Sequence, residues 1–155
     1  MPQSIEKIWQ DFQKAHALDF QPLNAYSFGR TSKEADETLA LVLQGKKRAS
    51  TSNYTLYFIE QSDLPQVGQY NVILDSLGEA RAITQTKAVE IIPLSSAGAM
   101  VAYLQGEDPA NFEKWRKRHV AFFKQESEKL QFPFREDMPI VVEIFEVAER
   151  VGTAE

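Results

Sequence analysis

Cysteine is absent from this chain of 155 residues, and histidine occurs only twice. Without cysteine there is no disulfide framework, no thiolate zinc site and no cysteine nucleophile. Two histidines would need carboxylates to complete a metal shell, and no spacing supports one, so we expect neither a metal nor a cofactor. The motifs GxxxxGK and GxGxxG are missing, so nucleotide hydrolysis and dinucleotide redox chemistry have no support.

Long hydrophobic runs are also missing. No apolar segment approaches the roughly 18 residues of a membrane-spanning helix. The opening segment MPQSIEKIWQ has neither the cationic region nor the apolar region of an export signal. The sequence therefore predicts a cytoplasmic protein that does not contact a membrane.

The charge balance is acidic, with 17 Lys and Arg against 22 Asp and Glu, for a net charge of −5. Hydrophobic residues make up 43% and charged residues 25%, which is typical of a globular protein, and the length suits one domain. The acidic balance argues against broad binding to duplex DNA, which relies on many cationic contacts to phosphate. It leaves room for a local basic cleft.

Helical patterns occur in three segments. Ile5, Ile8, Trp9 and Phe12 have the spacing of one helix face, with Ser4 as a plausible N-cap. A capping box over residues 31–34 opens a second helix that ends at Gly45. For the third helix, Asp108 and Pro109 are the predicted N-cap and first residue, and the aromatic pattern runs to about Leu130.

Strand patterns occupy residues 48–51, 70–75, 81–92 and 139–147, and the turn residues at 75–78 predict an antiparallel hairpin. Residues 54–59 fit either a strand or a helical turn. Strands with helices inserted between some of them predict the α+β class, as a strongly bent sheet or small barrel with helices on its outside.

An ordered set of short segments resembles the ASCH domain, a family of the PUA-like superfamily. The set runs from about residue 26 to residue 147 and consists of Phe28-Gly29, the helix 35–43 with the following GKKRAST (45–51), LPQVG (64–68), VILD (72–75), Gly106-Glu107, Trp115-Arg116 with His119 and Phe122-Phe123, and DMPIVVE (137–143). The resemblance divides the chain into an N-terminal helical extension packed on the domain (1–25), the ASCH domain (26–148) and a tail (149–155).

The resemblance implies a PUA-like β-barrel with a cleft that binds RNA or a modified nucleoside or nucleotide. One branch of the family hydrolyses acetylcytidine with a Lys, a Thr three residues later and a downstream Glu. These positions correspond to Lys47, Ser50 and Glu107 here, with Ser replacing Thr. Another branch is ribonuclease-like, and a non-catalytic RNA-binding module is a further alternative.

Each of these residues also has an ordinary structural explanation. Lys47 lies in a basic turn after a helix, where cations are favoured, and Glu107 fits a solvated loop. In a regular strand, side chains three residues apart point to opposite faces, so Lys47 must lie in the turn or at a bulge to meet Ser50. As base, Lys47 must be neutral, which burial or nearby cations would favour.

Four further residues are candidates for ligand binding. His119 lies at the centre of the aromatic arc of the third helix, so it faces inward either as a core histidine or as a donor in the cleft. Arg116 lies at the edge of the same stripe. Arg48 and Tyr54 suit phosphate contact and base stacking, although surface exposure and packing explain each residue, taken singly, slightly better.

Overall fold

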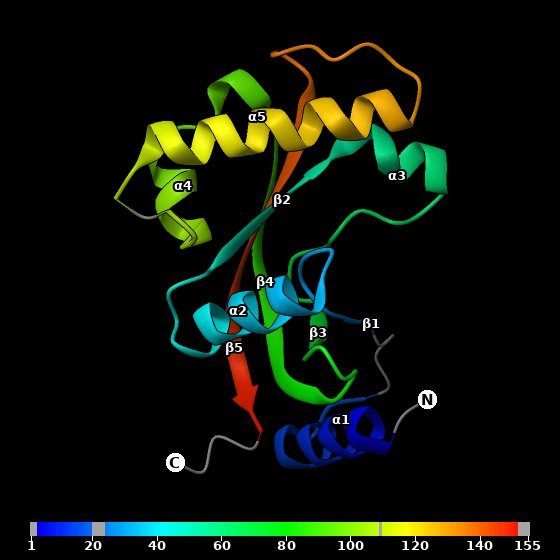
Figure 1. Cartoon of the computed structure of the whole chain (residues 1–155). Coiled ribbons are helices and arrows are strands. Elements are labelled where there is room, and N and C mark those ends of the chain that lie inside the picture. The colour runs from blue at the N-terminus through cyan, green and yellow to red at the C-terminus, as the bar shows by residue number, and fades with distance from the viewer. Residues whose placement is uncertain (1–2, 20–23, 109, 152–155) are drawn as a thin grey trace.

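The computed structural model describes residues 3–19, 24–108 and 110–151, and it has the α+β architecture predicted from the sequence (Figure 1). The elements follow in the order α1 (Gln3–His16), β1 (Asn24–Tyr26), α2 (Ser32–Leu43), β2 (Ala49–Asn53), α3 (Tyr54–Glu60), β3 (Tyr70–Leu74), β4 (Ala80–Pro93), the short 3-10 helix η1 (Leu94–Ser96), α4 (Ala99–Gln105), α5 (Phe112–Lys129) and β5 (Pro139–Arg150). None of the helices in these ranges is long and apolar enough to cross a bilayer.

The five strands form one curled sheet in the order β1-β3-β4-β5-β2. Only β1 pairs in parallel, with β3, and the other neighbours are antiparallel. Register shifts between Ile83 and Thr84 and between Thr86 and Ala88 interrupt the long β4–β5 ladder. Such irregularities increase strand twist and bend, which gives the sheet its half-barrel form.

Local signals explain two of the connections. The predicted hairpin joins β3 to β4, and Asp75 stabilises its turn by accepting hydrogen bonds from the backbone N–H groups of Leu77 and Glu79 at 2.9 and 3.0 Å. The ambiguous segment 54–59 is helical. Asn53 caps α3 by accepting from the Thr55 N–H at 3.0 Å, which ends β2 and begins the helix.

The capping predictions had mixed outcomes. Thr31 caps α2, as predicted, and accepts from the Glu34 N–H at 3.1 Å. The N-cap assignment of Ser4 was wrong, because Ser4 lies inside α1 and its hydroxyl accepts from the backbone N–H of Ala80 at 3.1 Å. This contact ties α1 to the start of β4.

The predicted start of the long helix was also wrong. Asn111, not Asp108, caps α5, and its side chain accepts from the Lys114 N–H at 3.0 Å. Asp108 instead forms ion pairs with Arg118 at 2.6 Å and with Lys114 at 3.6 Å. Pro109, the predicted first residue, lies outside the described residues.

Two apolar clusters lie at opposite ends of the sheet. The predicted stripe of α1 is buried against β3 and β4, where it contacts Val72 and Ile83. At the other end, Trp115 and Phe123 of α5 pack on Ile140 and Val142 of β5. Figure 1 shows α5 across the end of the sheet opposite α1. A third, smaller cluster of Leu39, Ile73 and Ala82 packs α2 against β3 and β4.

Candidate active site

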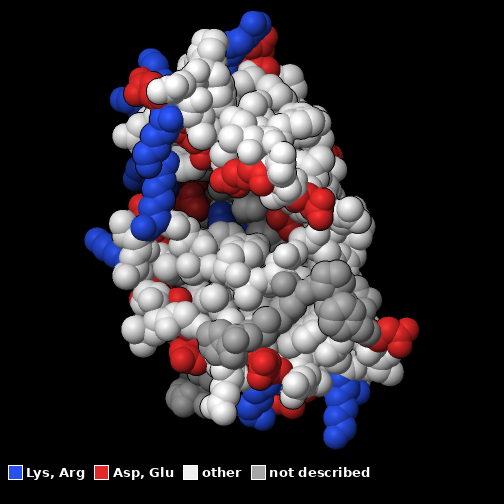
Figure 2. Space-filling model, turned by 90° about the vertical axis from the view of Figure 1, so that its right-hand side faces the viewer, with Lys and Arg blue, Asp and Glu red and all other residues white. Residues whose placement is uncertain are grey.

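A hollow opens in the side of the molecule below α3 and α5 and above α1. Figure 2 shows Lys or Arg and Asp or Glu side chains inside it. The loop after β1 reaches α5 at one side, where the Arg30 guanidinium lies 4.3 Å from the centre of the Phe122 ring and donates to Gln125 at 3.4 Å. The charged groups therefore lie in a recess between secondary-structure elements that are distant in sequence.

Lys47 enters this region from the turn between α2 and β2. Gly45 ends the helix with a positive φ of 73°, and the N–H groups of Lys46 and Lys47 both donate to the Leu41 carbonyl at 2.9 and 3.1 Å. Arg48 N–H then donates to the Leu104 carbonyl at 2.6 Å, which attaches the turn to α4. As a result, the Lys47 side chain is buried, with only 2% of its surface exposed.

The Lys47 ammonium group has a small set of polar contacts. Its Nζ donates to Glu107 Oε1 at 3.1 Å and to the Gln105 carbonyl at 3.4 Å. The same atom lies 5.6 Å from the centre of the Phe28 ring. Burial lowers the pKa of Lys47, and the Glu107 carboxylate opposes that change. The geometry thus places a lysine whose neutral form is favoured by burial beside a carboxylate that orients its side chain.

Glu107 is held by the turn that ends α4. Gly106 adopts a left-handed conformation with φ of 74°, and a Cβ there would lie only 2.7 Å from the carbonyl carbon and 2.9 Å from the nitrogen of the Lys46–Lys47 peptide. This close backbone contact explains why glycine is needed. Glu107 also accepts from Arg118 at 3.5 Å, so two cations share its carboxylate.

His119 joins the same group of side chains through Gln105. Its Nδ1 donates to the Trp115 carbonyl at 3.0 Å, because a carbonyl can only accept. In the neutral ring, Nε2 then accepts from the Gln105 amide at 3.3 Å, while Gln105 Oε1 accepts from Thr51 at 2.9 Å. Burial lowers the pKa of His119 and favours this neutral form. We call Lys47, Gln105, Glu107, Arg118 and His119 the Lys47 cluster.

Ser50 lies in β2, three residues after Lys47. It lies directly opposite Glu143 of β5 in the antiparallel register, whereas Thr51 faces the other side of the sheet, toward Gln105. Within the described residues, no hydrogen bond joins Ser50 to Lys47 or Glu107. The structure therefore brings two of the three predicted catalytic side chains into contact, and it places the third on the adjacent strand.

The chain also matches a protein-family model. The model of the ASCH domain matches residues 24–149. The chain belongs to the ASCH domain family. The match leaves all of α1 outside the family segment. The sheet order and the flanking helices are those of this PUA-like fold, so the fold expectation from the sequence is confirmed.

Two solved structures extend the match over nearly the whole ASCH-domain chain. Protein EF3133 from Enterococcus faecalis V583 is 33% identical, with a TM-score of 0.88 over 97% of this chain and 91% of its own. An ASCH domain from Lactobacillus crispatus JV V101 is 25% identical, with a TM-score of 0.86 over 95% of each chain. The comparison with curated proteins gave no match.

Of the four predicted ligand residues, His119 alone contacts the Lys47 cluster. Arg48 is exposed and lies 5.8 Å from the Tyr103 ring. Tyr54 packs edge-on against Phe58 on α3, at 5.3 Å between ring centres. Arg116 points to the loop after α5, where it pairs with Glu136 at 3.5 Å. These three side chains therefore contact residues outside the Lys47 cluster.

Sequence reasoning missed two polar members of the network, Gln105 and Thr51. Gln105 ends α4, a helix that was not predicted from the sequence, so nothing in the sequence indicated that Gln105 lies near Lys47. Thr51 follows Ser50 in a strand where alternate residues face opposite sides. The Thr51 hydroxyl bonds to Gln105 because α4 covers the side of the sheet to which Thr51 points. The sequence does not show which side that is. In the described part of the chain, no three His, Asp or Glu residues are grouped to hold a metal ion.

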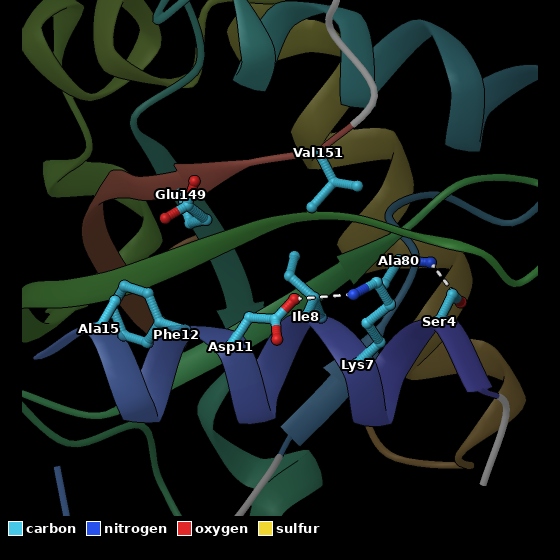
Figure 3. A pocket seen from close by; sticks show the side chains of 9 residues that line it. All are labelled: Ser4, Lys7, Ile8, Asp11, Phe12, Ala15, Ala80, Glu149 and Val151. Carbon is cyan, nitrogen blue, oxygen red and sulfur yellow. Dashed lines mark hydrogen bonds and ion pairs between the residues drawn. The ribbon is translucent and has the colours of Figure 1, made fainter. Parts of the chain in front are cut away.

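A separate cavity of about 330 Å³ lies between α1 and the ends of β4 and β5 (Figure 3). Ile8, Phe12 and Val151 give it an apolar lining, and the ion pair between Lys7 and Asp11 lies at its edge. Neither Lys47 nor its partners line this cavity. Its lining has no arrangement of groups suited to catalysis. We therefore place the candidate active site at Lys47.

Proposed function

We propose that this ASCH-domain protein binds a nucleoside, nucleotide or short RNA in the recess and hydrolyses an acyl group from the exocyclic amine of a cytosine base. The observation that carries the proposal is the buried Lys47 ammonium in contact with Glu107, 60 residues away in sequence. A lysine becomes a useful base when its surroundings favour the neutral form, and burial does this here.

The reaction then proceeds in two steps. Neutral Lys47 accepts the proton of the Ser50 hydroxyl while the Ser50 oxygen attacks the acyl carbon. The C–N bond to the cytosine amine breaks, and the lysine returns its proton to the leaving nitrogen. Water, activated by the same lysine, hydrolyses the acyl-serine ester and releases the carboxylic acid. Glu107 orients Lys47 and stabilises its charged form within each step, while the lysine holds the transferred proton.

The test is hydrolysis of acylated cytidines by the intact protein. We expect the Lys47→Ala variant to lose activity by a factor of roughly 10²–10⁴, the usual contribution of a general base. Lys46→Ala is the matched control, because Lys46 is the exposed neighbour of the same residue type and should leave the rate unchanged. Equal turnover by the wild type and Lys47→Ala would remove the proposed base.

The hydroxyl is tested separately. Ser50→Ala should abolish turnover, whereas Thr51→Val should retain most of it, because the Thr51 hydroxyl is already bonded to Gln105. A Ser50→Ala variant that forms product at the wild-type rate would exclude Ser50 as the nucleophile. Mass spectrometry of a rapidly quenched reaction should detect the acyl group on the wild-type chain.

A second candidate function is RNA binding without catalysis. It is favoured by the aromatic pair on α3, where Phe58 is 68% exposed and contacts Tyr54. Such rings stack on unpaired bases, and exposed cations such as Arg48 contact phosphate. This function predicts salt-dependent affinity for single-stranded or structured RNA, and absence of binding at low salt would eliminate it. Analysis of the ends of any cleaved RNA would identify ribonuclease activity.

A further inference from the structure

A second polar cluster lines the sheet beside the Lys47 cluster, and the reaction proposed above does not use it. It consists of Tyr26, Ser52, Tyr57, Thr86 and Glu143, and we call it the Glu143 cluster. These residues come from β1, β2, α3, β4 and β5, which are far apart in sequence. Their convergence indicates a binding surface built by the fold rather than by one loop.

The carboxyl group of Glu143 is held by one of its two oxygens. Thr86 Oγ1 donates to Oε2 at 2.5 Å. No described residue donates a hydrogen bond to Oε1, and no described cation lies within the 4.0 Å of an ion pair. One acceptor oxygen in a half-buried position therefore remains available to a ligand.

Besides Thr86, two tyrosine hydroxyls lie close enough to feel the charge of this carboxyl group. Ser52 Oγ and Tyr57 Oη share a hydrogen bond at 2.8 Å. Burial raises the pKa of Tyr26 and of Tyr57, and the negative charge of Glu143 raises both further, so each phenol keeps its proton. Burial also raises the pKa of Glu143, while the Thr86 hydrogen bond opposes that change. The ligand would therefore meet one acid among neutral groups.

Phe28 connects the two clusters. Its ring lies 5.4 Å from the Tyr26 ring and stacks on Phe145, two residues beyond Glu143, at 6.1 Å. The Lys47 Nζ lies 5.6 Å from the same ring. A planar ligand beside Phe28 would therefore have the lysine toward one end and Glu143 toward the other.

Register adds a constraint on what Glu143 binds. Glu143 is the direct partner of Ser50, so their Cβ atoms are about 5 Å apart on the same face of the sheet. A group bonded to the acyl carbon that Ser50 attacks would therefore lie next to Glu143 Oε1. In an acylated cytidine that group is the nitrogen on C4, which carries an N–H donor before and after hydrolysis.

We propose that Glu143 is the residue that distinguishes cytosine from uracil, by accepting a hydrogen bond from the N–H at C4 of the base. Uracil carries an oxygen at C4, and two acceptors facing each other would leave both unpaired. This inference rests on the proposed function, because it assumes that a pyrimidine occupies the recess. It adds the residue that selects the base.

The experiment is calorimetric titration of the intact protein with cytidine and uridine monophosphates at pH 8. We expect the wild type to prefer the cytidine ligand by roughly tenfold or more, the usual consequence of one unpaired buried polar group. Glu143→Gln should lose the preference, because its amide can donate to the uracil oxygen. Glu146→Gln, an exposed acid on the same strand, should keep it.

The outcomes separate the two proposals. Wild-type protein that binds both ligands equally, or Glu143→Gln that retains the cytidine preference, would overturn the role of Glu143 and leave nucleotide binding intact. Wild-type protein that binds no nucleotide or short RNA would overturn the proposed function. If Glu143→Gln does not fold, Thr86→Val decides: a reduced preference supports the role, and an unchanged preference overturns it.

Discussion

The Lys47 cluster and the Glu143 cluster both adjoin the Phe28 ring but differ in how their charges are compensated. Lys47 and Arg118 both contact Glu107, and Arg118 also pairs with Asp108 at 2.6 Å. Glu143 has a hydroxyl partner and no described cation within 4.0 Å. One cluster satisfies its charges internally, whereas the other leaves an acceptor for a ligand.

The difference has a physical basis in the cost of burial. An ion removed from water destabilises the fold unless another charge or a hydrogen bond compensates it. The Lys47 cluster meets this cost with partners from β2, α4 and α5, so it is fixed in place before any substrate arrives. In the Glu143 cluster, burial raises the pKa of the acid, and a single hydrogen bond from Thr86 opposes that change. Four predictions test this contrast, from the largest expected effect to the smallest.

The largest effect should come from Gly106→Ala, which disturbs the Lys47 cluster through the backbone. The added methyl group would meet the Lys46–Lys47 peptide while φ is 74°. We expect a loss of roughly 3–4 kcal/mol in the free energy of unfolding, from left-handed strain together with overpacking. Chemical denaturation measures it. The turnover of acylated cytidine should fall as well, because Lys47 moves.

Gly78→Ala is the matched control. Gly78 has a similar φ of 79°, but a Cβ there meets nothing within 4 Å. Its cost should therefore be only the left-handed strain of about 1–2 kcal/mol. Equal losses in the two variants would contradict the close contact between the α4 turn and the Lys47 peptide.

Removing the compensating charge should have the next largest effect. Glu107→Gln leaves the Lys47 ammonium buried without a carboxylate, so the pKa of Lys47 should fall further below its usual value. We expect a loss of roughly 2 kcal/mol at neutral pH. This is less than for a fully buried pair because Glu107 is 22% exposed. The rising limb of the pH–rate profile should move to lower pH, because Lys47 acts as the base in its neutral form.

Glu136→Gln provides the comparison for that variant. Glu136 forms an ion pair with Arg116 at 3.5 Å, and its side chain is 66% exposed. Surface ion pairs contribute less than about 1 kcal/mol to stability. This variant should therefore leave the free energy of unfolding and the pH–rate profile nearly unchanged. A pH–rate profile that is identical in Glu107→Gln and the wild type would exclude Glu107 as the partner that sets the charge of Lys47.

Local patterns explain how much of this molecule the sequence could predict. The stripe of α1, the capping box of α2 and the β3–β4 hairpin each depend on residues within a few positions of one another. By contrast, α4 spans only Ala99–Gln105 and has no capping side chain, and β1 spans only three residues. Neither segment is long enough to show a periodic pattern in the sequence. Asp108 and Asn111 were both competent caps, and the ion pair with Arg118 decided between them.

The candidate site was less accessible to sequence reasoning than the fold. The contact between Lys47 and Glu107 followed from family resemblance alone, because no local periodicity relates residues 60 positions apart. The Glu143 cluster requires the register of β2 against β5, which places Ser50 opposite Glu143. The register of two strands depends on bulges and on tertiary packing, so the residue pairs across β2 and β5 could not be predicted from the sequence pattern.

A smaller effect should follow from Thr51→Val, which keeps the shape of the side chain and removes its hydroxyl. Gln105 Oε1 then loses its donor at a buried position, so we expect a loss of about 1 kcal/mol. Urea denaturation measures the change, and nuclear magnetic resonance of the Gln105 amide reports whether His119 remains bonded. Thr55→Val on the half-buried α3 surface is the control, and a larger loss there would contradict the Thr51–Gln105–His119 network.

The last prediction uses acid to separate the two clusters. Burial lowers the pKa of His119 below 6.5, so the unfolded chain takes up that proton first, and stability falls as the pH drops from 6.5 to the folded value. Burial raises the pKa of Glu143 above 4.5, so the folded chain takes up that proton first, and this contribution grows as the pH falls through the folded value. The two clusters therefore respond to acid with opposite sign.

Variants make these opposing contributions measurable by urea denaturation between pH 7.5 and pH 4. His119→Gln should lose less stability on acidification than the wild type, and Glu143→Gln should lose more. His16→Gln, which replaces the exposed histidine at the end of α1, should follow the wild-type curve. If both cluster variants shifted the acid response in the same direction, the contrast between a compensated and an uncompensated cluster would fail, because burial would then act on both groups through a common change in the fold.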